Sequence, residues 1–178
     1  GAGVIFGATG GVTEAALRSA YYLLFQEDLP ADAVNFEVVR GMKGVRECVL
    51  DFKGTEVRIA VVSGLHNTNE VLDKLVAGQY YHWIEVMGCP GGCIGGGGQP
   101  YAGANAVPLD ENMLARRAAA LYTLDAERPL RCSHHNPSIQ KLYAEFLGEP
   151  LGHKSHELLH TYYYPRVPMG VRPQEAQH

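Results

Sequence analysis

The residues of this sequence best suited to chemistry are two cysteines in a glycine-rich stretch. Cys89 and Cys93 are separated by Pro-Gly-Gly, and four glycines follow at positions 95–98. Such a loop can fold two thiolates toward one point, and its glycines tolerate positive φ, so that backbone N–H groups face that point as well. Thiolates bind iron–sulfur clusters, zinc or copper(I). The loop therefore predicts a thiolate-bound metal centre and suits an anionic sulfur cluster.

The spacing of the two cysteines by itself leaves a disulfide or half of a structural zinc site equally open. Structural zinc needs a second ligand pair, usually within two short Cys or His motifs. Cys48 and Cys132 stand alone in the sequence, and we interpret both as core or surface thiols. Four scattered cysteines also argue against a disulfide framework.

Histidines offer a second set of possible ligands. His156 and His160 stand four residues apart on one predicted helical face, but no acidic third ligand follows at motif spacing. We therefore predict a packed, hydrogen-bonded helix end there. His134 and His135 lie in a polar loop, and we expect them to face solvent.

Two further classes of function are disfavoured. The segment 4–11 reads as a strand followed by a glycine-rich turn, but Thr13 occupies the place of the third glycine of a dinucleotide fingerprint. The run Tyr162–Tyr164 has no basic residues interleaved with it. We expect it to pack against a protein partner rather than to stack on bases.

The elements that must position the cysteine loop follow from periodicity and turn residues. In chain order we predict a buried strand at Val4–Phe6, a helix over 12–24, a strand at Phe36–Arg40, a hairpin over 45–62, a helix at His66–Ala77, a strand at Tyr81–Met87, and helices at Asp110–Leu124 (capped by Asp110), Pro137–Leu147 and His153–His160. This order predicts an α/β fold whose loops gather at strand ends, where such folds bind ligands.

Composition limits the remaining possibilities. The chain has 178 residues, 46% of them hydrophobic and 19% charged, which fits one compact globular domain. A net charge of −4 gives no footprint for nucleic acid, and no apolar run is long enough to span a membrane. Of the 21 glycines, 13 fall within positions 1–11 and 88–103. The backbone must approach something closely at these two places.

The cysteine loop also carries a resemblance to a known family. The segment from Glu85 to Pro100 (EVMGCPGGCIGGGGQP) resembles the third cluster-binding signature of the iron-only (FeFe) hydrogenases. The segment 3–18 resembles the strand-to-helix segment beside the active site of that family, and 140–152 with 155–161 resembles its C-terminal end. The resemblance spans residues 1–164 in the order of the family.

The resemblance implies a cofactor and its ligands. Cys89 would ligate a cubane 4Fe–4S cluster, and Cys93 would ligate the same cluster and bridge it to a diiron unit that carries CO, CN⁻ and a bridging dithiolate. Met87 would pack beside the diiron unit. Phe6 and Gly7 would line the pocket around its diatomic ligands. The helix N-terminus after residues 10–11 would favour the negative charge of the cluster.

The resemblance also implies a fold and a partner. Residues 1–164 would form the C-terminal lobe of the hydrogenase catalytic domain, with a short, mainly parallel twisted sheet flanked by helices, and residues 165–178 an extended Pro-containing tail. The opening core strand, with no segment before it, predicts the second part of a larger fold. The cluster of this family needs four cysteines, so an N-terminal part or subunit must supply two of them, and the chain alone would not be an enzyme.

The complete enzyme would catalyse 2H⁺ + 2e⁻ ⇌ H₂, with electrons from a carrier such as ferredoxin or an NADH-linked subunit. We expect a cytoplasmic location and leave a periplasmic one open. The alternative function is that of a non-catalytic relative, such as an iron–sulfur assembly protein or a nuclear prelamin-binding protein. The full segment 96–100 and Met87 favour the hydrogenase, because a pocket so closely packed serves the diiron unit.

Overall fold

The computed structural model describes residues 1–30, 33–41, 44–100, 103, 107 and 109–164. The chain divides into two compact units, Gly1–Asn136 and Pro137–His178, called unit 1 and unit 2 below. The tail predicted at 165–178 lies outside the described residues.

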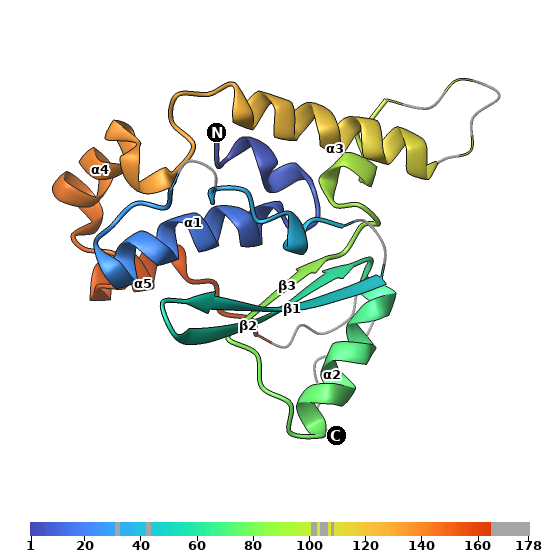
Figure 1. Cartoon of the computed structure of the whole chain (residues 1–178), viewed down its shortest axis with the longest axis horizontal. Coiled ribbons are helices and arrows are strands. Elements are labelled where there is room, and N and C mark those ends of the chain that lie inside the picture. Colours follow the sequence, from blue (N-terminus) through green and yellow to red (C-terminus); the bar gives the residue numbers. More distant parts are fainter. Residues whose placement is uncertain (31–32, 42–43, 101–102, 104–106, 108, 165–178) are drawn as a thin grey trace, which may run out of the picture. The chain divides into compact units, whose positions relative to one another are not determined.

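Unit 1 is built on a three-stranded sheet in the order β1-β2-β3 (Figure 1). Its strands are β1 (Gly44–Phe52), β2 (Thr55–Ser63) and β3 (Trp83–Met87). The predicted hairpin is confirmed: β1 pairs antiparallel with β2 through a turn in which Lys53 and Gly54 both have positive φ, 53° and 89°. The third strand runs parallel to β2. The predicted α/β class is confirmed, but the sheet is mixed rather than mainly parallel, because a two-residue turn can join only antiparallel strands.

Helices cover both faces of the sheet, as alternate residues of β2 point to opposite sides. One face packs against α1 (Gly11–Phe25) through a core cluster of Leu17, Val39, Phe52, Ile59 and Val61. The other face packs against α2 (Thr68–Val76) through Ala60, Val62, Val71 and Tyr81. Figure 1 shows these two helices on opposite sides of the sheet. Burial on both faces explains the continuous apolar run 59–62 in the second half of β2.

Two predicted strands are wrong. Val4–Gly7 forms a 3₁₀ helix, η1, and Glu37–Val39 forms another, η2. Their amides bond to carbonyls three residues back, as from Ala8 N to Ile5 O at 3.1 Å and from Arg40 N to Glu37 O at 3.1 Å. Apolar runs this short do not distinguish a strand from a tight helical turn, and neither run has a partner strand among the described residues.

The remaining helices agree with the sequence to within a turn. In unit 1, α3 spans Glu111–Ala126, and the predicted cap is confirmed, because Asp110 Oδ1 accepts a hydrogen bond from Met113 N at 3.0 Å. Helix α2 begins two residues later than predicted, after the 3₁₀ turn η3 (Leu65–Asn67).

The described part of unit 2, residues 137–164, contains short helices. Helix α4 (Pro137–Leu142) runs into a π-helical turn, η6 (Tyr143–Leu147), and α5 (His153–Leu159) follows. The predicted single helix at 137–147 therefore changes its hydrogen-bond register halfway. Gly148, with φ of 84°, donates to Tyr143 O five residues back at 2.7 Å and ends the turn.

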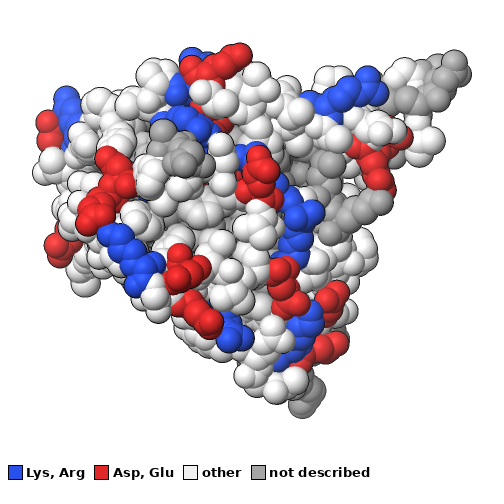
Figure 2. Space-filling view, in the orientation of Figure 1, with Lys and Arg blue, Asp and Glu red and all other residues white. Residues whose placement is uncertain are grey.

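The surface agrees with the charge balance of the sequence. On the face that Figure 2 shows, acidic and basic side chains are interspersed, with no broad patch of one sign. Within the part of the chain that the structure describes, no helix is both long and apolar enough to span a bilayer.

The interior of unit 1 holds an ionic network that links α1 to α3. The side chains of Arg18, Glu14 and Asp125 are fully buried. Arg18 donates to both oxygens of Asp125, at 2.9 and 2.8 Å, and to Glu14 at 2.7 Å. Arg40 donates to Glu14 at 2.7 Å, and Arg131 donates to Asp125 at 2.7 Å. Each buried carboxylate thus receives charge-assisted bonds from two arginines.

The network also sets the titration of its acid. Burial by itself would raise the pKa of Asp125, but hydrogen bonds from Arg18 and Arg131 outweigh burial and lower it. Asp125 therefore stays ionised at neutral pH, and its contribution to stability is lost only as the pH falls through this lowered pKa.

Removing one partner of this network should destabilise unit 1 strongly. Arg18→Met leaves Asp125 without its bidentate partner, and breaking a buried ion pair in this way costs about 3–5 kcal/mol. The measurement is native-state hydrogen exchange of the α1 and α3 amides in the intact protein.

The double variant Arg18→Met with Asp125→Leu should recover most of the loss, because no unpaired buried charge remains. Arg116→Ala is the matched control, since Arg116 is exposed and its guanidinium donates to Asn112 O within its own helix. Equal exchange in the Arg18 and Arg116 variants would contradict a structural role for the network.

Candidate metal centre

The two cysteines begin two consecutive tight turns directly after β3. Gly92 N donates to Cys89 O at 3.0 Å, and Gly96 N donates to Cys93 O at 3.0 Å. A side-chain carbon at Gly96 would lie 3.6 Å from Cys89 Sγ and 3.7 Å from the Cα of Cys93. Both cysteines are exposed and free. The loop therefore exposes two free thiols close together in the chain, as two ligands of one metal centre must be.

The cysteine loop is held by the segment that precedes α1. Thr9 N donates to Gly91 O at 3.0 Å, and Gly91 N donates to Ser63 Oγ at the end of β2 at 2.9 Å. Gly92 has φ of 95°, and a side-chain carbon there would lie only 2.7 Å from Gly7 O. The two glycine-rich segments of the sequence thus approach each other.

An apolar anchor fixes the other side of the loop. After Cys93 the chain enters the 3₁₀ turn η4 (Cys93–Gly95), and Ile94 is 5% exposed. Ile94 packs with Ala8 and Leu114 in one core cluster. The thiol of Cys93 is exposed while its neighbour is buried, so the loop has a rigid base beneath the exposed cysteines.

The sequence predicted that the N–H groups of the loop face a ligand, and four of them do not. Positive φ is found at three loop glycines, Gly91, Gly92 and Gly98. However, the N–H groups of residues 91, 92, 95 and 96 all donate to protein oxygens in or beside the loop. These four amides hold the loop in shape and are not directed at a ligand.

The N-terminus of α1 is occupied by an acidic side chain that the sequence reasoning missed. Glu85, buried on β3, accepts from Gly10 N at 2.7 Å, from Thr13 N at 2.8 Å and from Thr13 Oγ1 at 2.6 Å. Trp83 Nε1 donates to the same Thr13 hydroxyl at 2.9 Å. The positive end of the helix is thus neutralised inside the protein, and the prediction that it favours the cluster charge is wrong. A lone acidic residue in an apolar strand was the signal for this contact.

The other predicted site residues, Gly7, Met87 and Phe6, differ in how they lie relative to the contact between residues 7–9 and the cysteine loop. Gly7 faces it directly, and a side-chain carbon at Gly7 would also meet Leu121 Cδ1 at 2.9 Å. Met87 ends β3 two residues before Cys89 and is half-buried, with its carbonyl bonded to Gly64 N at 2.8 Å. Phe6 lies on η1 and is 46% exposed.

The remaining thiols stay apart from this centre. Cys48 packs against the core from β1, and Cys132 precedes the 3₁₀ turn η5 (Ser133–His135). Both are half-buried and free, and burial raises the pKa of each thiol.

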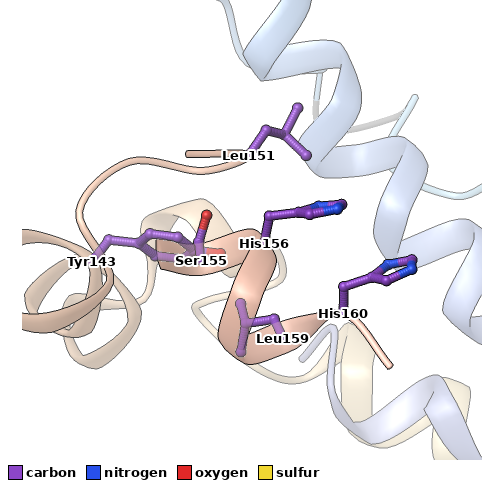
Figure 3. A pocket seen from close by; sticks show the side chains of 6 residues that line it. All are labelled: Tyr143, Leu151, Ser155, His156, Leu159 and His160. Atoms are coloured by element: carbon purple, nitrogen blue, oxygen red, sulfur yellow. The ribbon is translucent and has the colours of Figure 1, made fainter. Parts of the chain in front are cut away.

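The histidines divide into two groups. His156 and His160 stack at 4.8 Å in unit 2 and line a small cavity of about 190 Å³ with Tyr143 and Ser155 (Figure 3). No third ligand joins them in the described part of the chain. Both histidines are exposed, so the predicted packing of this helix end is wrong. His134 is different: its side chain is only 11% exposed, so the prediction that it faces solvent is wrong.

A larger cavity of about 480 Å³ lies beside the cysteine loop in unit 1. Its lining includes Ser63, His66, Pro90 and Leu114, and neither cysteine is part of it. It is therefore separate from the face on which the thiols are exposed.

The fold and the loop define a class of protein: an α/β lobe that exposes a pair of free cysteines on a glycine-rich loop. Comparisons with known families identify it further. Residues 1–97 match the family described as iron-only hydrogenase large subunit, C-terminal domain. Residues 111–166 match the iron hydrogenase small subunit. The chain belongs to the iron-only hydrogenase family.

Individual relatives agree with this assignment. The chain is 52% identical over 166 residues to the NADP-reducing hydrogenase subunit HndD of Solidesulfovibrio fructosivorans, covering 93% of this chain and 27% of that protein. It is 39% identical over 165 residues to iron hydrogenase 1 of Clostridium pasteurianum, covering 92% and 28%. A solved FeFe-hydrogenase HydA1 from Chlamydomonas reinhardtii has 41% identity and a TM-score of 0.65, covering 89% of this chain and 45% of that one. The chain thus spans about a quarter of the length of these two curated relatives.

Two further matches bear on organisation and function. The periplasmic Fe hydrogenase large subunit of Nitratidesulfovibrio vulgaris is 48% identical over 101 residues, which cover only 56% of this chain and 24% of that protein. Cytosolic iron-sulfur assembly component 3 of Mus musculus is 32% identical over 161 residues, covering 89% of this chain and 32% of that protein.

The contact between the glycine segments gives a direct test of how the loop is held. Gly92→Ala should displace the cysteine loop, because φ of 95° with ψ of −158° is a conformation nearly confined to glycine and the added carbon meets Gly7 O. Backbone strain of this kind costs about 1–3 kcal/mol before the clash is counted. The readout is iron content after cluster reconstitution, together with the thermal unfolding temperature.

Gly3→Ala is the matched control, because nothing lies within 4 Å of a side-chain carbon there and its φ is −65°. This variant should keep iron content and unfolding temperature at the unmodified values. If both variants lose iron equally, the contact with Gly7 does not hold the loop.

Proposed function

We propose that this chain is the part of an FeFe hydrogenase that supplies two of the four cysteine ligands of its active-site cluster. The observation that carries the proposal is the Cys89–Cys93 loop: two exposed, free thiols on a loop whose base is packed against residues 7–9. The similarity to hydrogenases across more than nine tenths of the chain supports it. Reversible H₂ chemistry would belong to the complete protein and not to this chain alone.

The residues of the loop fit the implied cofactor. Thiolates are the ligands that iron–sulfur clusters use, and two of them are exposed on one loop here. In this proposal Cys89 ligates a cubane 4Fe–4S cluster, and Cys93 ligates it and bridges to a diiron unit with CO, CN⁻ and a dithiolate. When bound, this group supplies the electrons and the iron site for 2H⁺ + 2e⁻ ⇌ H₂.

The task of the protein is to hold the ligands and to exclude water. Ile94 and the Gly92 contact fix the backbone on which Cys93 stands. Met87, at the end of β3, offers a polarizable thioether as a dry wall beside the diiron unit. Phe6 and Gly7 would complete that wall, and the exposure of Phe6 leaves its ring available to a cofactor or to the partner part.

A second function is favoured by one observation, the similarity to cytosolic iron–sulfur assembly proteins. Mouse assembly component 3 and Protein NAR1 of Arabidopsis thaliana match about nine tenths of the chain, at 32% and 29% identity. Such a protein would bind an iron–sulfur cluster without turning over hydrogen. Infrared bands at CO and CN⁻ frequencies in the assembled protein separate the two functions, because only the diiron unit carries these ligands.

The two cysteines should respond differently to substitution. Cys93→Ala removes the bridge, so the CO and CN⁻ bands and H₂ turnover should both disappear. Cys89→Ser keeps an oxygen ligand, so part of the cluster should survive with a shifted potential, because ligand type contributes to that potential. Met87→Leu keeps the volume but loses the thioether, so turnover should fall while both iron groups remain. Iron content, infrared spectra and H₂ turnover are measured for each variant.

Cys48→Ser is the control, since it removes a half-buried thiol on β1 and should leave spectra and turnover intact. The bridging role of Cys93 is refuted if Cys93→Ala keeps the CO and CN⁻ bands and normal turnover.

We also propose an obligate partner part that carries the other two cysteines. Four thiols are needed for a cubane, whereas Cys48 and Cys132 are packed elsewhere. Strand β3 is at the sheet edge, and its Trp83, Ile84 and Val86 are 39%, 37% and 40% exposed. An electron carrier, ferredoxin or a pyridine-nucleotide-linked subunit, would complete the system. The naming of HndD as NADP-reducing supports the latter and a cytoplasmic location.

The free chain should therefore aggregate or stay partly unfolded, while co-expression with the N-terminal part should give a soluble complex with an interface of about 2,000 Å² or more. Size-exclusion chromatography with light scattering compares the two preparations. A free chain that is monomeric, monodisperse and cooperatively folded would contradict the obligate partner.

A further inference from the structure

A second cluster of metal-binding side chains lies in unit 1, at the far end of α1 from the cysteine loop. Ligand atoms of Cys132, His134 and His135 all lie within 4.8 Å of one another. They gather beside Ser19 and Tyr22 of α1, about 16 Å along the helix from its first residue at 1.5 Å per residue. We propose that these three residues and Asp28 form a structural zinc site.

Asp28 offers a fourth donor beside the two histidines, although it lies outside the group of three whose ligand atoms are all within 4.8 Å of one another. Its Oδ1 lies 3.1 Å from His134 Nε2 and 2.9 Å from His135 Nε2. Zinc bonds of about 2.0–2.1 Å to nitrogen and oxygen place neighbouring ligands about 3.3 Å apart in a tetrahedron. The distances from this carboxylate oxygen to the two imidazole nitrogens are thus close to the separation expected between ligands of one zinc ion. The sulfur of Cys132, within 4.8 Å of the histidine ligand atoms, would have to move closer to reach the same centre.

The ring of His134 is oriented through its second nitrogen, as the rings of metal-binding histidines usually are. Its Nδ1 lies 3.3 Å from the Ser19 hydroxyl, and its ring stacks on Tyr22 at 4.3 Å with an angle of 8° between the planes. A ligating histidine commonly bonds through its second nitrogen to a protein oxygen, which sets the tautomer and aims the first nitrogen at the metal. Ser19 provides that oxygen, and Nε2 is left on the side of Asp28.

The chemistry of the donors selects the metal. Thiolate, imidazole and carboxylate are all ligands that zinc accepts, and zinc has no geometric preference of its own from d-electrons. Binding displaces the proton of the Cys132 thiol to solvent. Without a metal, the same histidines and Asp28 would form a hydrogen-bonded ion cluster, in which Cys132 has no role.

The proposed site would join two segments that are far apart in sequence. Asp28 belongs to the segment that matches the large-subunit family, and the other three ligands belong to the segment that matches the small-subunit family. The three lie directly before unit 2, which begins at Pro137. Zinc would therefore fix the end of unit 1 to α1, in addition to the ionic network around Arg18.

The test is the zinc content and zinc-edge X-ray absorption of the cluster-loaded protein, purified without a histidine tag and supplied with Zn²⁺. We expect one zinc per chain with a single sulfur ligand near 2.3 Å and nitrogen or oxygen ligands near 2.0–2.1 Å, values typical of such bonds. A zinc with two sulfur ligands would instead report occupation of the Cys89–Cys93 loop and would overturn the assignment.

Two variants and one control make the result specific. Cys132→Ser should lose the sulfur signal and at least tenfold in zinc affinity. His135→Ala should also lose at least tenfold in zinc affinity. His135 is 42% exposed, so its loss does not endanger folding. Cys48→Ser, the control thiol, should keep both zinc and signal. Zinc binding that is weaker than micromolar, or unchanged by Cys132→Ser, would leave only a hydrogen-bonded cluster of His134, His135 and Asp28, and the proposal fails.

Discussion

The close backbone contact between residues 7–9 and the cysteine loop is the constraint on which the rest of this structure depends. At Gly92 no side chain fits, because Gly7 O would lie 2.7 Å from its first carbon. The contact fixes where the loop leaves β3 and where α1 begins. Since both segments are short and irregular, their mutual packing rather than regular secondary structure positions the two thiols.

The electrostatics of unit 1 are largely satisfied within the protein. Glu85 neutralises the start of α1, and Arg18 links Glu14 to Asp125 at full burial. These charges orient α1 against β3 and α3, and the directional bonds of a guanidinium specify one arrangement. Beside the exposed thiols the chain does place one cation, because the Arg117 guanidinium donates to Ile94 O at 2.7 Å and to Pro100 O at 2.8 Å.

The ionic network also explains how two family segments make one unit. Glu14, Arg18 and Arg40 lie in the large-subunit segment, and Asp125 and Arg131 lie in the small-subunit segment. The large subunit from Nitratidesulfovibrio vulgaris matches only 56% of this chain. The ionic side chains thus connect the large-subunit segment to the small-subunit segment, in addition to the covalent link through residues 98–110.

The sequence by itself determined the elements whose signals are local. The hairpin follows from alternation around Lys53-Gly54, the cap of α3 from Asp110, and the candidate ligands from the spacing of Cys89 and Cys93. Only the tertiary structure decided what depends on distant partners. Val4–Gly7 became a 3₁₀ turn, Gly91 N bonded to Ser63 Oγ on β2, and Glu85, Arg18 and His134 found their partners 70 or more residues away. Local periodicity carries no information about such contacts, since their free energy arises only once the chain has folded.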